Sequence, residues 1–164
     1  MDNKLMAIKI AVAAVMATLT DFLGWKGMLL VILALMMFLD YMSGTLAAKK
    51  NGTWSSKVAR EGLFHKGGII VVCLIALVLD AVLAVAFPHI PLIGGEIKNP
   101  GIFLPLVAVW YIITEIGSVL ENAVMMGAPV PKWFRKAIEK AGKLVNKAGE
   151  TASNDDIDSP PDEE

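Results

Sequence analysis

The chain has 164 residues, of which 55% are hydrophobic, and its mean hydropathy is +0.60. This composition is too apolar for a soluble domain of that length, so it predicts an integral membrane protein. The formal net charge is −1, but basic residues gather in the middle of the chain and acidic residues at its end. The overall charge therefore indicates no particular partner. The single cysteine, Cys73, excludes an intrachain disulfide and offers no metal-ligand spacing.

Four hydrophobic segments follow in chain order, near residues 5–25, 28–48, 68–87 and 101–125. Each has the ~20 residues that a helix needs to cross a hydrocarbon layer of about 30 Å. The first is the least secure, because Lys9 and Asp21 fall within it. The predicted fold is therefore an all-α integral membrane protein with four transmembrane helices, or three, followed by a basic amphipathic helix and a disordered acidic tail.

The basic residues predict the orientation. With four spans, one side of the membrane holds the N-terminus, the 49–67 loop and the C-terminal segment, and with them all of the 15 basic residues except Lys26 and Lys98. The positive-inside rule then predicts a multi-pass protein of the cytoplasmic membrane whose N- and C-termini are both cytoplasmic. With three spans the N-terminus would lie outside, and Lys4 and Lys9 would violate the rule.

The C-terminal part divides into two regions. Over 131–149 apolar residues recur every three or four positions opposite basic ones, which predicts an amphipathic helix on an anionic cytoplasmic leaflet. A solvated helix that packs on another part of the protein is the alternative. We expect a transmembrane domain over 1–128, this helix over 129–149 and a disordered tail over 150–164. The residues predicted to lie at the membrane surface are Lys132, Trp133, Arg135, Lys136, Lys140, Lys143 and Lys147.

Carboxylates lie inside the predicted spans. A charged aspartate near the centre of a membrane helix costs ~2.5–3.5 kcal/mol, so we do not expect these groups to face lipid. Segments two to four contain no lysine or arginine, so no internal salt bridge is expected. Protonation, polar neighbours or a hydrated interior remain as ways to satisfy them. Asp40 is near the cytoplasmic end of its segment, so Asp80 and Glu115 are expected to be more demanding.

Small and polar residues share helix faces with these carboxylates. In the third segment, for example, Cys73, Ala76, Asp80 and Ala84 form one stripe. Such stripes let membrane helices approach closely, either within one chain or between subunits. The candidates for lining a pore or packing helices are Asp40, Ser43, Gly44, Asp80, Glu115, Ser118, Glu121 and Asn122.

Two stretches resemble the signature regions of a known family. They are "DYMSGTLAAKKNGTWSSKVAREGLFHKG" (40–67) and "TEIGSVLENAVMMGAPVPKWFRKAI" (114–138). The first contains Asp-Tyr-x-Ser-Gly and a basic Asn-Gly loop with Ser-Ser-Lys. The second contains a Glu, a Ser, Glu-Asn and Gly-x-Pro-x-Pro. This pattern is similar to that of the phage lysis and toxin-secretion holins, holin family 4, over about residues 28–138, without the acidic tail.

The resemblance implies a phage or prophage protein that is not an enzyme and that oligomerises in the bacterial cytoplasmic membrane. Such a protein permeabilises the membrane at a set time, so that an endolysin reaches the cell wall, while some relatives export toxins. The implied partners are the lipid bilayer, further copies of the chain, an endolysin and, for some members, an antiholin. No cofactor, metal or nucleic acid is implied.

Two other classes stay open from the residues alone. Four-helix membrane proteins with an embedded glutamate include small proton-coupled transporters, although here the acids are scattered over three helices. An antiholin or other regulatory membrane subunit is the second alternative. An enzyme is not expected, because His65 and His89 lie far apart in predicted loops and no catalytic constellation accompanies them.

Overall fold

The computed structural model describes residues 3–89 and 101–154. Within these ranges the chain is helical and contains no strand, which confirms the all-α prediction. The elements are α1 (Asn3–Leu23), α2 (Trp25–Lys50), α3 (Ser56–Ala86), the short 3-10 helix η1 (Phe87–His89), α4 (Phe103–Met125) and α5 (Lys132–Asn154). Residues 90–100, which include Lys98, and most of the predicted acidic tail lie outside the described residues.

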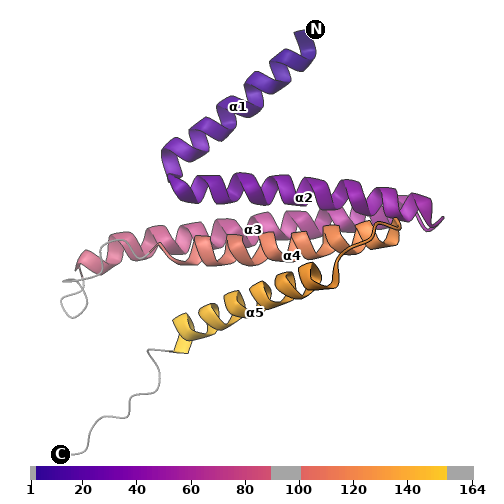
Figure 1. Ribbon diagram of the computed structural model, residues 1–164. Helices are drawn as coiled ribbons and strands as arrows, with labels where there is room; N and C mark the ends of the chain where they lie inside the picture. The colour runs from indigo at the N-terminus through magenta and orange to yellow at the C-terminus, as the bar shows by residue number, and fades with distance from the viewer. Residues whose placement is uncertain (1–2, 90–100, 155–164) are drawn as a thin grey trace, which may run out of the picture.

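Three helices, α2, α3 and α4, lie side by side and form the body of the molecule (Figure 1). The central one is α4, because α2 and α3 each contact α4 much more extensively than they contact each other. The three helices share one apolar core, formed by Leu33, Met37, Ile69, Cys73, Ala76 and Leu104. These same helices are the three in the described part of the chain that are long and apolar enough to cross a membrane.

The first helix stands apart from this body. Gly24 alone connects α1 to α2, with φ at +59°, and the two helices form a V that opens toward the other end of the body (Figure 1). Every described side chain of α1 is exposed. The helix predicted over 5–25 therefore exists, but its assignment as a fourth transmembrane span stays a prediction.

The third helix is longer than predicted. It begins at Ser56 rather than at Gly68, so most of the predicted 49–67 loop is helical. The charged residues of this stretch lower its hydropathy without lowering its helix propensity. The side chain of Ser55 caps the helix by accepting a hydrogen bond from the backbone N–H of Val58 at 3.2 Å. At 31 residues α3 is about 46 Å long, more than a ~30 Å hydrocarbon layer requires.

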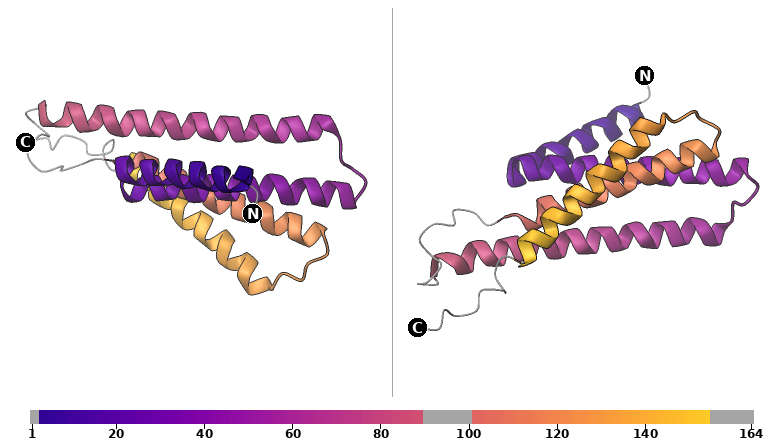
Figure 2. Two further views of the ribbon diagram at one scale, coloured as in Figure 1. Left: turned by 90° about the horizontal axis from the view of Figure 1, so that it is seen from above. Right: turned by 60° about the horizontal axis from the view of Figure 1, so that its bottom comes forward.

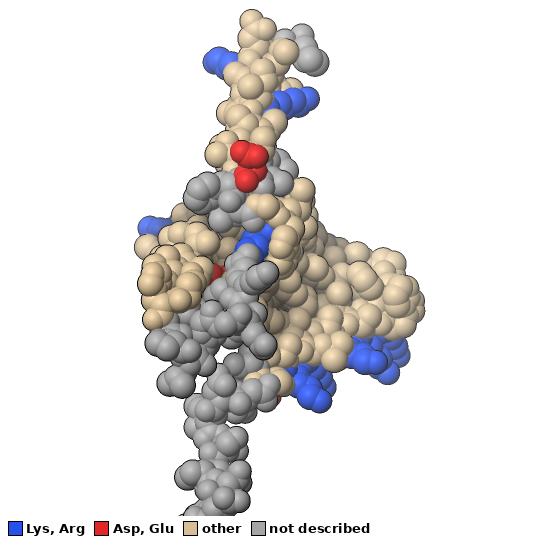
Figure 3. All heavy atoms as spheres, turned by 90° about the vertical axis from the view of Figure 1, so that its left-hand side faces the viewer, with Lys and Arg blue, Asp and Glu red and all other residues tan. Residues whose placement is uncertain are grey.

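The last helix folds back along α4 (Figure 2). The face turned to α4 is half-buried and includes Ile138, Gly142 and Val145, and Trp110 donates a hydrogen bond through Nε1 to Oδ1 of Asn146. The basic side chains gather on the side of α5 turned away from α4 (Figure 3). The predicted amphipathic helix is thus present, and part of its apolar face packs on another part of the protein.

Candidate functional site

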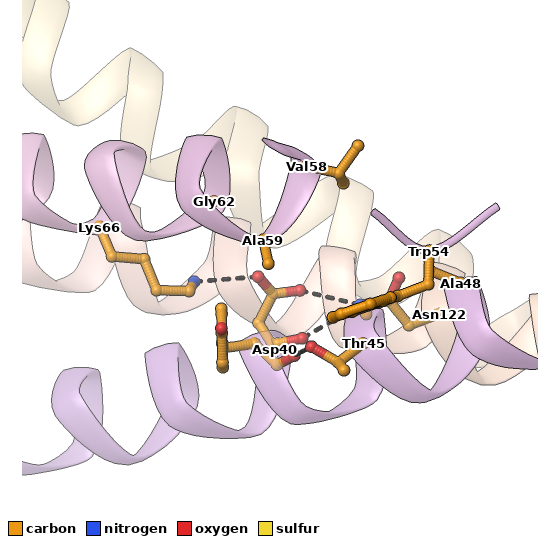
Figure 4. A pocket seen from close by; sticks show the side chains of 11 residues that line it. Asp40, Thr45, Ala48, Trp54, Val58, Ala59, Gly62, Lys66 and Asn122 are labelled. Carbon is orange, nitrogen blue, oxygen red and sulfur yellow. Dashed lines mark hydrogen bonds and ion pairs between the residues drawn. The ribbon is translucent and has the colours of Figure 1, made fainter. Parts of the chain in front are cut away.

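A lysine shared by two carboxylates joins the three central helices. Lys66 of α3 places its Nζ 2.9 Å from Oδ2 of Asp40 on α2 and 2.6 Å from Oε2 of Glu115 on α4. The residues Lys66 and Glu115 are only 7% and 3% exposed. Figure 4 shows the lysine reaching Asp40 from the neighbouring helix. Each of the three helices therefore contributes one charge to a single buried cluster.

An amide completes the cluster on the side of Asp40 opposite Lys66. The Nδ2 of Asn122, on α4, donates to Oδ1 of Asp40 at 2.9 Å and to Oγ of Ser43 at 3.0 Å. Gly44 lies directly against this amide, since a Cβ at position 44 would be in van der Waals contact with Nδ2, at 3.4 Å. We call these six residues, Asp40, Ser43, Gly44, Lys66, Glu115 and Asn122, the Lys66 cluster.

The expectation that no internal salt bridge forms is wrong. Hydropathy places Lys66 in a loop, because it precedes the apolar run by two residues, whereas α3 begins ten residues before Lys66. A signal was nevertheless present in the sequence. The buried stripe of α3 includes Lys66, Ile69, Cys73, Ala76 and Asp80, at spacings of 3, 4, 3 and 4, so the predicted stripe from Cys73 to Asp80 extends back to the lysine.

The cluster is deep and its charges do not balance. Asp40 lies ten residues before the end of α2 and Glu115 ten residues before the end of α4, about 15 Å along each helix. Asp40 is therefore level with Glu115, and the expected difference in depth between them is not found.

Two carboxylates and one ammonium carry a formal charge of −1, and a buried arrangement of this kind is stable only while every member keeps its partners.

Asp80 has a different environment at the opposite end of the body. Its carboxylate accepts hydrogen bonds from the backbone N–H groups of Phe103, at 2.9 Å, and Leu104, at 3.1 Å. These are free donors at the N-terminus of α4, where the helix dipole also favours a negative charge. The Nζ of Lys26 lies 3.9 Å from the same carboxylate. Asp80 thus caps a neighbouring helix and is fully satisfied there.

The other candidate residues lie outside the cluster. Ser118 donates its hydroxyl to the backbone carbonyl of Thr114, within its own helix. Glu121 is exposed and lines a hollow of about 400 Å³ between α4 and α5, together with Arg135 and Glu139. The seven residues predicted to lie at the membrane surface are all exposed on α5. The structure therefore brings together five of the eight intramembrane candidates and adds Lys66, which was missed.

Three apolar helices that share a buried charged cluster define a multi-pass membrane protein. Comparison with known proteins agrees with this class, since the model of the bacteriophage holin family matches residues 17–143. The match covers more than half of the chain, and the chain belongs to the bacteriophage holin family. This is a family of membrane pore formers without enzymatic activity, and it makes the present chain a holin-like membrane protein.

Known relatives extend over nearly the same length. An uncharacterised protein of Clostridium perfringens strain 13 is 30% identical over 146 residues, which are 89% of this chain and 98% of the relative. A relative from the same species, an uncharacterised 14.9 kDa protein in the nagH 3′ region, is 29% identical over 85% of this chain and 96% of its own length. An uncharacterised protein of Halalkalibacterium halodurans is 36% identical over 77% of this chain and 87% of its own length. No solved structure matches.

Proposed function

We propose that the protein is a phage or prophage holin that accumulates in the bacterial cytoplasmic membrane, oligomerises and permeabilises it at a set time. The opening lets an endolysin reach the cell wall, or lets a toxin or other protein leave the cell without lysis. Family membership supports the class of activity. The Lys66 cluster is the observation that supports a mechanism, because it places charges from three helices inside the apolar body.

The cluster suggests two states. While α2, α3 and α4 are packed, Lys66 satisfies both Asp40 and Glu115. If the helices separate, these side chains lose their partners, and charged groups at membrane depth are then stable only against water. Helices that separate would therefore expose the cluster to a hydrated opening between copies of the chain. The packed state keeps the membrane sealed, and the separated state lines the lesion.

The membrane potential acts on the same residues. Moving one elementary charge through 100 mV changes its energy by about 2.3 kcal/mol. A cluster with a formal charge of −1 at the centre of the body responds to the potential in a way that a neutral core does not. Loss of the potential would thus change the balance between the packed and separated states.

The basic end of the body indicates the cytoplasmic side. Lys49 and Lys50 lie in the last turn of α2, while Lys57 and Arg60 lie in the first turns of α3. We propose that this end and the N-terminus face the cytoplasm, in keeping with the positive-inside rule. We also propose that α5, which here packs along α4 as far as Trp110, leaves α4 in the membrane and lies on the cytoplasmic side. The exposed basic face of α5 and Trp133 then meet the anionic leaflet.

Inducible expression in a bacterium tests the proposal. We expect growth arrest and loss of membrane potential, and lysis when a cell-wall hydrolase without an export signal is co-expressed. Glu115→Gln removes a cluster charge and is expected to shift the time of permeabilisation. Glu61→Gln, at a carboxylate whose side chain is 64% exposed on α3, is the matched control and is expected to keep the original time. Inserted protein that leaves the potential intact would exclude a holin activity.

A further inference from the structure

A groove runs between α2 and α3 on the side that α4 does not cover. Next to the Lys66 cluster it is a hollow of about 260 Å³, lined by Asp40, Lys66 and the ring of Trp54 (Figure 4). Directly beyond the cluster it continues as an apolar hollow of about 290 Å³, whose lining includes Met37 and Cys73. We call the two hollows together the α2–α3 groove. Apolar side chains line the groove along most of its length. At one level the groove is lined by the Lys66 cluster, whose formal charge is −1.

The first helix has the properties of a segment that fills such a groove. It has 21 residues, and its exposed apolar side chains include Leu5 and Val12, which are 48% and 52% exposed. The view from the end of the body shows this helix projecting from the rest of the molecule (Figure 3). It already contacts α2 of its own chain beside Gly24. Docking on α2 of another copy would be a contact between the same two helices.

The connection between α1 and α2 disfavours docking within one chain. Antiparallel helix pairs are joined by loops of about 2–5 residues, whereas Gly24 is here the only residue between the two helices. A glycine at φ +59° holds a sharp bend that other residues rarely adopt. Folding α1 flat against its own α2 would require helical turns to unwind. We therefore propose that α1 docks into the α2–α3 groove of a second copy of the chain.

Charge and depth support this occupant. Lys9 precedes Gly24 by 15 residues and Asp40 follows it by 16, so both lie about 23 Å along their helices from the shared connection. In a membrane that holds both copies at one depth, Lys9 of one copy reaches the level of the Lys66 cluster of the other. Its charge would balance the cluster. Leu5 and Val12 lie on the same helical face as Lys9 and would meet the apolar lining.

The contact can be tested by disulfide crosslinking in membranes, with Cys73→Ala as the background. Val12 precedes Gly24 by 12 residues and Met37 follows it by 13, so the docked arrangement brings them to one level. Two differently tagged chains, one with Val12→Cys and one with Met37→Cys, are expected to form a mixed disulfide. Ala11→Cys faces the other side of α1 and is the matched control, for which little mixed disulfide is expected. Lys9→Glu in the Val12→Cys chain is expected to reduce the mixed product, and Lys9→Arg to preserve it.

The inference rests on the oligomerisation proposed above, but the two can fail separately. Crosslinking does not depend on permeabilisation, and native electrophoresis reports oligomers whatever their contacts. Oligomers that form without the Val12–Met37 product would overturn the groove contact and leave the proposed function standing. A disulfide that forms only when both cysteines are on one chain would show that α1 docks on its own body, which also overturns the proposal.

Discussion

Lys66 determines whether two carboxylates can remain charged inside an apolar body. Removing one partner from a buried ion pair leaves an uncompensated charge, which costs more than the pair itself contributes. Asp40 and Glu115 share the same lysine, so its loss leaves both of them without a cation. The arrangement therefore makes the packing of three helices depend strongly on one side chain.

We expect Lys66→Met to lower the free energy of unfolding by about 3–5 kcal/mol, the usual cost of breaking a buried pair. Thermal unfolding in detergent, followed by circular dichroism, measures the change. Lys57→Met is the control on the same helix, because the Lys57 side chain is 80% exposed and its ion pair with Glu61 is worth about 1 kcal/mol or less.

A triple variant distinguishes charge from shape. Combining Lys66→Met with Asp40→Asn and Glu115→Gln removes every charge of the cluster, and we expect it to recover most of the lost stability. If the triple variant were as unstable as Lys66→Met alone, the loss would come from packing of the lysine stem and not from the unpaired carboxylates.

Part of this cluster could be predicted from the sequence and part could not. Helical spacing places Asp40 and Ser43 on one face of their helix and Glu115 and Asn122 on one face of theirs, because the period of a helix is fixed. The partner on α3 depends on how far that helix extends past its apolar run, which hydropathy does not report. The partners of Asp80 could not be predicted either. Its hydrogen-bond donors are backbone N–H groups of another helix, which no side-chain pattern reveals.

Among the helices, α5 has two apolar surfaces with different surroundings. The face with Ile138 and Val145 is half-buried against α4, whereas Trp133 and Leu144 are 71% and 61% exposed. Exposed apolar residues beside lysines are typical of helices at the surface of an anionic membrane. Packing on α4 accounts for one face in this structure, and the proposed contact with lipid headgroups concerns the other face once α5 has left α4.

A fluorophore on α5 tests the proposed lipid contact. In a Cys73→Ala background, Leu144→Cys carries an environment-sensitive label, and Lys143→Cys places the same label about 100° away, on the basic face. We expect quenchers at headgroup depth to act more strongly at 144 than at 143, and the difference to grow with anionic lipid, since each basic residue near such a surface contributes about 1 kcal/mol. Equal quenching at both positions would contradict the proposal.

The positions of helix ends were harder to predict than the helices themselves. The predicted spans over 28–48 and 101–125 match α2 and α4 to within a few residues, because hydropathy falls where those helices end. In α3 the helix begins before the apolar run, at Ser56. Its first turns are charged and make the helix longer than its apolar part. Hydropathy thus predicts the part of a helix that suits lipid, and the rest of the helix must come from propensity and capping.

At the scale of the whole molecule, α4 contacts α2, α3 and α5 and holds the body together. This central role cannot be predicted from hydropathy, since all three apolar helices are of adequate length. The body of α2, α3 and α4 has two ends, one with the 51–55 connection and one with the start of α4 (Figure 1). The orientation in the membrane is given by which of these ends faces the cytoplasm.

Accessibility of single cysteines tests the proposed orientation, again with Cys73→Ala. Ser56→Cys marks the basic end and Ile102→Cys the opposite end, and both positions are exposed. Before the membrane potential is lost, a membrane-impermeant maleimide added to spheroplasts is expected to label Ile102→Cys and to spare Ser56→Cys. Inside-out vesicles should show the reverse. Labelling of Ser56→Cys in intact spheroplasts would invert the proposed topology.

The bend at Gly24 has a consequence for the number of copies. When α1 of one copy enters the α2–α3 groove of another, the contact is heterologous. Every copy added then still offers an undocked α1 or an empty groove. Growth ends only when the rotation between neighbours closes a ring, and otherwise it continues as an open array. The angle at Gly24 contributes to that rotation. Inserting residues there should therefore change the size of a closed assembly before it changes the fold of any one copy.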